Sequence, residues 1–260
     1  MAKTAKLRWL LVITTAAIAG VALMRPTPQS EAYHHFADGR TIGGIPNFFN
    51  VISNLPFVVV GGAGLSVVGR ANKRIRLMYI VLFAGVLLTG LGSAYYHWHP
   101  HDDTLVWDRI PMTLVFMSLF SATLAELVEL RAGRLLLIPL LLIGVGSVIW
   151  WHFTESRGHG DLRWYGLVQF YPVLVIPILL WLFYDPRYKP AIQSLGWVVV
   201  WYLLAKGAEA MDASIYKTIG VSGHTIKHLA AAVATTYLVQ MFLRKYPARP
   251  KAALKRTTIS

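Results

Sequence analysis

Eight long apolar runs divide the chain, and short polar segments separate them. The runs lie at 9–24, 47–68, 77–96, 110–127, 135–151, 165–184, 192–206 and 224–243. Each is close to the roughly 20 residues that a helix needs to cross the apolar core of a bilayer. The pattern therefore predicts an all-α, polytopic membrane protein with eight transmembrane helices.

The overall composition supports an integral membrane protein. The 260 residues are 55% hydrophobic and only 14% charged, whereas about a quarter of the residues of a soluble domain are charged. Cysteine is absent, which excludes disulfides and thiolate ligands. Any transition metal must then be held by histidine, carboxylate or water.

Positive charge collects at one side of the predicted bundle. Seventeen of the 25 Lys and Arg residues lie in segments 1–8, 70–76, 129–134, 185–189 and 244–260, which share one face if all eight helices cross. This bias predicts that both termini are cytoplasmic. The formal charge of +13 does not indicate nucleic acid as a partner, because no basic stripe with interleaved aromatic residues is present.

The first apolar run is typical of a signal anchor. Lys3, Lys6 and Arg8 precede it, so we expect an uncleaved N-terminal helix over residues 1–24. The alternative is a cleaved signal peptide, since Ala17 and Ala19 resemble a small-residue cleavage site.

Five polar residues that can do chemistry are expected at the opposite, outer face. Ser93 and His97 are four residues apart, and His224 and His228 repeat that spacing at the start of the last run. Residues four apart share one face of a helix. Asp108 lies at the mouth of the fourth predicted helix. We therefore predict that the two regions meet in space and hold one metal ion.

The expected ligands are characteristic of a catalytic zinc site. His97, His224 and His228 supply three imidazoles from two helices, which leaves one coordination position for water. Zinc lowers the pKa of bound water to roughly 7. Asp108 is placed to accept that proton and return it to a leaving group, and Ser93 to hydrogen-bond a developing oxyanion. Polar residues within a membrane are costly and usually functional.

Other nearby residues leave alternatives open. His99 and His101 are close enough to replace a ligand, although we interpret them as solvated residues of a wet loop. Glu209 and Asp212 follow the seventh run. They either hydrogen-bond a ligand histidine and fix its tautomer, or are solvated loop residues.

A haem site is the less favoured interpretation of the histidine pair. Paired histidines on separate helices can serve as axial ligands. Two histidines four apart on one helix, however, do not present to opposite faces of a porphyrin.

With these residues assembled, the chain resembles the alkaline ceramidase family, within the wider group of membrane hydrolases that includes the adiponectin-receptor-like proteins. The resemblance extends over residues 38–243. The residues that carry it are Asn50-Val51-Ile52-Ser53-Asn54-Leu55, Gly92-Ser93, His97, Asp108, His224 and His228.

The resemblance implies a seven-helix transmembrane domain over residues 25–243, with the helix at 1–24 added outside it and a basic cytoplasmic tail at 244–260. It also implies that His97, His224 and His228 bind zinc while Ser93 and Asp108 assist hydrolysis of a ceramide amide. One departure makes calcium doubtful as a second cofactor, because only Asp38 and Asn47 stand where the family's eukaryotic enzymes have an acidic calcium-binding segment.

We therefore expect a hydrolase of linear amide bonds that acts on a sphingolipid-like membrane lipid. The basic, proline-containing tail is bacterial in style, so we expect a bacterial inner membrane with the metal site at the periplasmic face. The alternative is a receptor-like lipid-binding protein with a structural zinc. An open coordination position favours the enzyme, and four protein ligands favour the receptor.

Overall fold

The computed structural model describes residues 2–248, and these form a helical protein without β-strands. Its α-helices are α1 (Lys3–Leu23), α2 (Phe48–Ile52), α3 (Leu55–Val67), α4 (Lys73–Trp98), α5 (Asp102–Leu127), α6 (Leu130–Glu155), α7 (Arg163–Leu182), α8 (Lys189–Ala210), α9 (Asp212–Ile219) and α10 (Gly223–Lys245). Three short 3₁₀ turns lie at Glu31–His34, Val68–Arg70 and Pro186–Tyr188. Eight segments of the described chain are long and apolar enough to span a membrane, which confirms the predicted all-α membrane fold.

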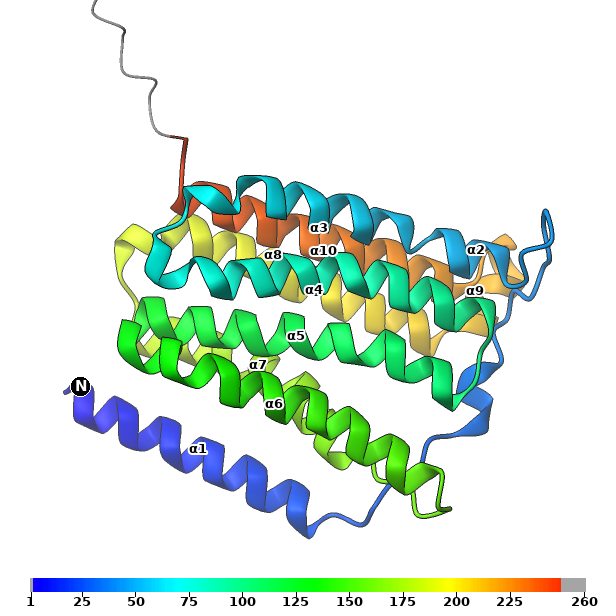
Figure 1. Ribbon diagram of the computed structural model, residues 1–260, viewed down its shortest axis with the longest axis horizontal. Helices are drawn as coiled ribbons and strands as arrows, with labels where there is room; N and C mark the ends of the chain where they lie inside the picture. The colour runs from blue at the N-terminus through cyan, green and yellow to red at the C-terminus, as the bar shows by residue number, and fades with distance from the viewer. Residues whose placement is uncertain (1, 249–260) are drawn as a thin grey trace, which may run out of the picture.

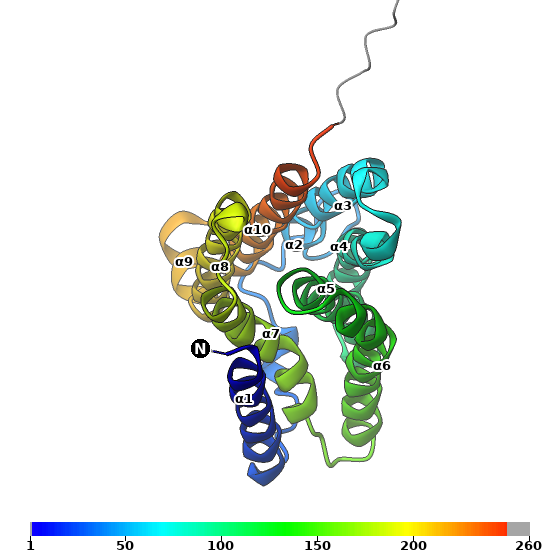
Figure 2. The same ribbon diagram turned by 90° about the vertical axis from the view of Figure 1, so that its left-hand side faces the viewer.

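Seven of these spans form a bundle, and α1 lies outside it. Figure 2 looks along the bundle and shows α3, α4, α5, α6, α7, α8 and α10 grouped together, with α1 at their edge. α4 packs on α3 and α5, α5 packs on α6 and α7, and α10 joins α8 to α3. Among the spans, α7 is the main contact of α1 (Figure 1). The predicted arrangement of a seven-helix bundle with one additional N-terminal helix is therefore present.

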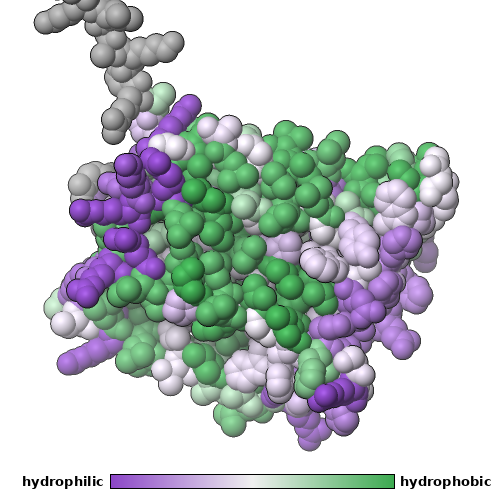
Figure 3. All heavy atoms as spheres, in the orientation of Figure 1, coloured by the Kyte–Doolittle hydropathy of each residue, from purple (hydrophilic) through white to green (hydrophobic). Residues whose placement is uncertain are grey.

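The bundle has an apolar belt between two polar ends. Figure 3 shows hydrophobic side chains over the middle of the molecule and hydrophilic ones at both ends of its long axis. Large apolar side chains point outward within the belt, including Leu142 (68% exposed) and Trp181 (77% exposed). In water such a surface would be unfavourable, so the belt is suited to contact lipid chains.

Glycines allow close helix packing along α4, from its middle to the end that carries His97. A Cβ atom at Gly92 of α4 would overlap the carbonyl oxygen of Trp107 on α5. A Cβ at Gly61 or Gly64 of α3 would likewise overlap Leu87 or Phe83 of α4. Small residues bring helix backbones together in membranes, and here they draw α3 and α5 against α4.

The second predicted span is divided at its polar end. α2 ends at Ile52 and α3 begins at Leu55, with Pro56 in its first turn. Because proline lacks an N–H donor and constrains the preceding residue, it is favoured at helix starts. The side-chain amide of Asn54 donates to the carbonyl of Asn50 at 2.8 Å, which satisfies a carbonyl left free at the break.

Two helices differ from the sequence expectation. α5 begins at Asp102 rather than near residue 110, so Asp108 lies within a helix and not before one. A capping box between His101 and Thr104 starts this helix, a signal that hydropathy does not register. The segment expected as a loop before Gly223 contains the amphipathic helix α9.

The N-terminal helix is joined to the bundle by polar contacts. The hydroxyls of Thr14 and Tyr171 lie 2.6 Å apart, and the guanidinium of Arg163 donates to the carbonyl of Met24. No side chain of α1 is buried. Of the basic tail expected at 244–260, residues 249–260 lie outside the described residues.

We predict that Gly92→Ala destabilises the fold. Its methyl group would push α4 from α5, and overpacking of this kind costs about 1–3 kcal/mol. The thermal unfolding midpoint of detergent-purified protein should fall by several degrees. Gly146→Ala on α6 is the matched control, because nothing lies within 4 Å of its Cβ position. An unchanged midpoint for Gly92→Ala would show that the two helices do not need their close approach.

Candidate metal centre

Three histidine side chains meet at one end of the bundle. His97 lies in the last turn of α4, and His224 and His228 lie in the first two turns of α10. Their ring centroids are 4.7 to 4.9 Å apart, and all three are buried. One nitrogen from each ring lies within 4.8 Å of the other two. This group can hold a metal ion.

The ring of His228 is oriented by a hydrogen bond. The hydroxyl of Ser53 donates to the carbonyl of Asn50 at 3.0 Å, and its oxygen lies 2.8 Å from Nδ1 of His228. Because the hydroxyl proton is already used, the Ser53 oxygen accepts from Nδ1–H. The Nε2 lone pair of His228 then faces the other histidines, which is the tautomer that a metal ligand requires.

His97 completes a nitrogen-rich site. Its Nε2 lies 3.1 Å from Nε2 of His228, close to the roughly 3.3 Å that separates two ligands around one tetrahedral ion. Its Nδ1 is buried and has no hydrogen-bond partner among the described residues. Three imidazoles with no carboxylate among them fit zinc or a related transition metal better than a hard cation such as calcium.

Asp212 holds the start of α10, which carries two of the three histidines. Its Oδ1 accepts from the backbone N–H of His224 at 3.1 Å and from the Ser222 hydroxyl at 2.5 Å. Its Oδ2 accepts from the backbone N–H of Ala37 at 3.0 Å. Asp212 thus binds backbone and cap rather than an imidazole ring, and it fixes the helix end that positions His224.

Glu209 forms an ion-pair network beside the histidines. Its carboxylate accepts from Lys206 at 2.5 Å and from Lys227 at 2.7 Å. The Lys227 ammonium lies 3.2 Å from Nε2 of His224. Lys227 therefore lies between Glu209 and the ring of His224. The negative charge of Glu209 offsets that of the Lys227 ammonium, which would otherwise repel a metal ion.

Lys227 is a site residue that the sequence analysis did not single out. Its position between His224 and His228 on α10 was the available signal, since a charged residue in a membrane helix usually has a functional partner. Its partner Glu209 lies on another helix, and sequence spacing alone does not connect the two.

Ser93 and Asp108 lie beside the histidines on α4 and α5. Both side chains are buried. The close approach at Gly92 puts these two helices in contact at this level. Ser93, Asp108 and His228 line one end of a cavity of about 140 Å³. The structure thus brings all five predicted site residues to one place.

An aromatic ring from the N-terminal segment covers the histidines. The ring centroid of Phe36 lies 4.6 Å from that of His97 and 4.7 Å from that of His224. The hydroxyl of nearby Tyr33 donates to Glu209 at 3.4 Å. Phe36 thereby limits water at the site, a role that its position in a polar segment did not suggest.

The residues considered for calcium make internal contacts instead. Arg40 donates to both carboxylate oxygens of Asp38, at 2.8 and 2.6 Å, and to the carbonyl of Gly220 at 2.9 Å. These hydrogen bonds hold the pKa of the Asp38 carboxyl below its ordinary value. The side-chain amide of Asn47 donates to the carbonyl of His97 at 3.0 Å. This segment therefore ties the loop before α2 to the metal centre.

The two alternative ligands lie away from the cluster. His99 and His101 are exposed in the turn between α4 and α5. The described histidines that converge are the three on α4 and α10, a set that leaves room for a non-protein ligand.

Comparison with known protein families gives one match. A family model described as Ceramidase matches residues 42–244, which is most of the chain and includes every residue of the histidine cluster. No curated protein matches the chain.

We predict that purified protein contains about one zinc ion per chain and that His224→Ala removes it. Loss of one of three imidazoles leaves too few ligands to retain the ion. Elemental analysis after purification without chelator measures the metal directly. His159→Ala is the matched control because this histidine is exposed in the loop after α6. Well-folded wild-type protein without metal, or equal metal in His224→Ala, would contradict the assignment.

Proposed function

The chain belongs to the ceramidase family, and from that premise we propose that it is a zinc-dependent membrane amidase. Its substrate is a ceramide-like lipid amide, which it cleaves to a fatty acid and an amine. The observation that carries the proposal is a cluster of three buried imidazoles, one of which, His228, lines an apolar cavity together with Ser93 and Asp108.

The ligand set supports zinc as the resident metal. His97, His224 and His228 would hold it, and the absence of a fourth converging protein ligand among the described residues fits a catalytic site with an open position. When bound, zinc supplies a Lewis acid that polarises an amide carbonyl and acidifies water.

Asp108 is the proposed general base and acid. Its carboxylate takes the proton from the attacking water and delivers it to the nitrogen of the departing amine, so that the C–N bond breaks without forming an amide anion. Ser93 lines the same cavity as Asp108 and can direct its hydroxyl to the carbonyl oxygen as negative charge develops there. Both groups lie on helices and are buried, which keeps them in place.

The cavity supports a lipid substrate. From Ser93 and His228 it continues between apolar side chains to Leu238, ten residues along α10 and so about 15 Å deeper in the bundle. Ala231 and Ala234 leave room along this path. An acyl chain would lie here while its amide reaches the metal centre.

A second cavity gives a route from the bilayer. It has a volume of about 380 Å³ and lies between α5, α7 and α8, with Trp181 and Tyr184 among its lining residues. Phe116 and Tyr202 line both this cavity and the one at the metal centre. We propose that the lipid enters sideways between α7 and α8 and passes these two aromatic rings.

The proposed orientation places both termini in the cytoplasm and the metal centre at the outer, periplasmic face of a bacterial inner membrane. It is supported by the excess of Lys and Arg in the segments that connect the helices at the end opposite the histidines, following the positive-inside rule.

We expect Asp108→Asn to abolish turnover while the metal stays bound. Loss of a general acid–base group lowers rates by about 10²–10⁴, and Ser93→Ala should lower kcat by up to roughly 10²–10³. Fatty-acid release from defined ceramides in detergent micelles, measured by mass spectrometry, tests both variants. Asp103→Asn, an exposed residue on the same helix, is the control. Hydrolysis by Asp108→Asn at the wild-type rate would refute the proposed role.

The cavity makes a separate prediction about chain length. Ala234→Phe should place a ring in the acyl path and lower kcat/KM for long-chain ceramides by roughly tenfold or more, with short-chain substrates much less affected and metal content unchanged. Val233→Phe is the control, because Val233 faces outward on the same helix. Equal losses for long and short chains would place the acyl chain elsewhere.

A further inference from the structure

A cationic pocket lies at the end of the bundle opposite the metal centre. It has a volume of about 760 Å³ and lies between the first turns of α4 and α6. Lys73 and Arg74 line it from α4, and Arg131 and Arg134 line it from α6. Glu129 is the one carboxylate among its lining residues, so the pocket carries a clear excess of positive charge.

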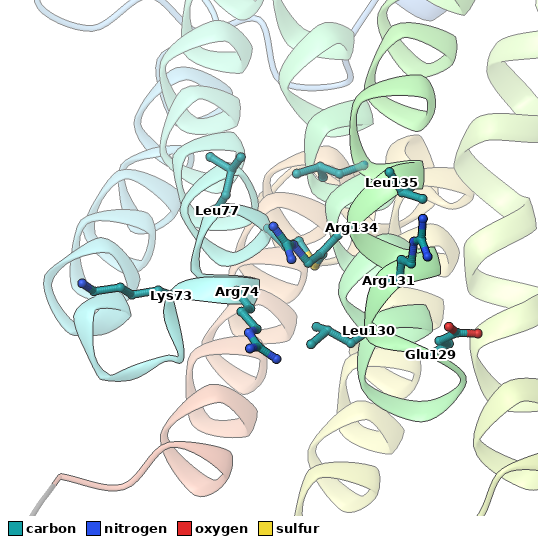
Figure 4. A pocket seen from close by; sticks show the side chains of 10 residues that line it. Lys73, Arg74, Leu77, Glu129, Leu130, Arg131, Arg134 and Leu135 are labelled. Atoms are coloured by element: carbon teal, nitrogen blue, oxygen red, sulfur yellow. The ribbon is translucent and has the colours of Figure 1, made fainter.

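Two of the four cationic side chains, Arg74 and Arg134, lie at the gap between the two helices, whereas Lys73 and Arg131 extend away from it on either side (Figure 4). Figure 4 shows the guanidinium of Arg134 reaching from α6 toward α4, with Arg74 below it on the other side. The carboxylate of Glu129 lies away from this gap. None of the four cationic side chains forms an ion pair or a side-chain hydrogen bond within the described part of the protein.

Two other cations at the same end have partners within the protein. Arg76 donates to the carbonyls of Gly69 and Ala71, and Lys245 pairs with Glu126. A general preference for positive charge at one face accounts for the number of cations here. It does not by itself account for four cations that line one pocket without an ion-pair partner among the described residues.

The walls of the pocket join the apolar belt. Leu77 on α4 and Leu135 on α6 line the pocket and are 54% and 66% exposed. Ile138 and Leu142 continue the exposed apolar surface along α6. A ligand at this site can therefore place negative charge among the arginines and hydrocarbon chains along α6 at the same time.

We propose that this pocket binds the headgroup phosphate of an anionic phospholipid, with the acyl chains lying along α4 and α6. Basic pockets between transmembrane helices bind anionic lipid headgroups in this way, and arginine forms bidentate hydrogen bonds to phosphate. The site is separate from the metal centre and does not depend on the proposed hydrolase activity.

The test uses full-length, delipidated protein in detergent, titrated with phosphatidylglycerol or phosphatidylcholine and followed by native mass spectrometry. We expect preferential binding of phosphatidylglycerol. A variant with Arg74→Gln, Arg131→Gln and Arg134→Gln should bind it more weakly by roughly fivefold per charge removed. The control variant carries Lys3→Gln, Arg70→Gln and Lys189→Gln, three exposed cations at the same end that do not line the pocket. It should bind like the wild type.

Two further arms identify the ligand without relying on the variants. Raising the ionic strength from about 0.05 to about 0.5 M should weaken binding of phosphatidylglycerol and spare phosphatidylcholine. Glycerol phosphate, which has the phosphate but no chains, should compete poorly. Equal affinity for the two lipids, equal loss in both variants, or full competition by glycerol phosphate would overturn the proposal.

Discussion

Three imidazole rings buried in an apolar bundle are the feature on which the rest of this structure depends. Polar groups away from water are unfavourable unless each has a partner, and within a membrane helix the need is greater. Ser53 therefore holds the ring of His228, Asp212 holds the backbone of His224, and Glu209 neutralises the adjacent Lys227. The helix ends, the loop before α2 and the short helix α9 are all arranged around these partners.

Much of the fold could be predicted because hydropathy records which segments contact lipid. It placed eight spans, yet it misplaced the start of α5 by eight residues, since polar first turns such as Asp102–Asp108 dilute the apolar signal. Helix α9 was missed for a related reason, because an amphipathic helix of eight residues does not form an apolar run. Capping residues set the start of α5, and local amphipathicity defines α9. Neither feature is detected by the average hydropathy of a stretch of sequence.

Sequence spacing predicted those residues of the candidate site that lie on the same helix or helix end. His224 and His228 are one turn apart, and Ser93 and His97 repeat that interval. The supporting residues were not visible in this way. Phe36 contacts the histidine rings from a segment some sixty residues before His97, and Glu209 meets Lys227 across two helices. Such contacts arise from packing, and a single sequence contains no periodic signal for them.

Cationic side chains are partnered differently at the two ends of the bundle, and this difference fits the functions that we propose for the two ends. At the candidate metal centre, Lys206 and Lys227 both pair with the Glu209 carboxylate, so these two cations are engaged within the protein. At the far end, Arg74, Arg131 and Arg134 line a pocket and have no ion-pair partner among the described residues, so their charge is available to an external anion. Neither arrangement of charges is needed for the helices to cross a membrane. The end whose lysines are paired is therefore suited to the metal ion that we propose, and the end with unpaired arginines to an anionic lipid.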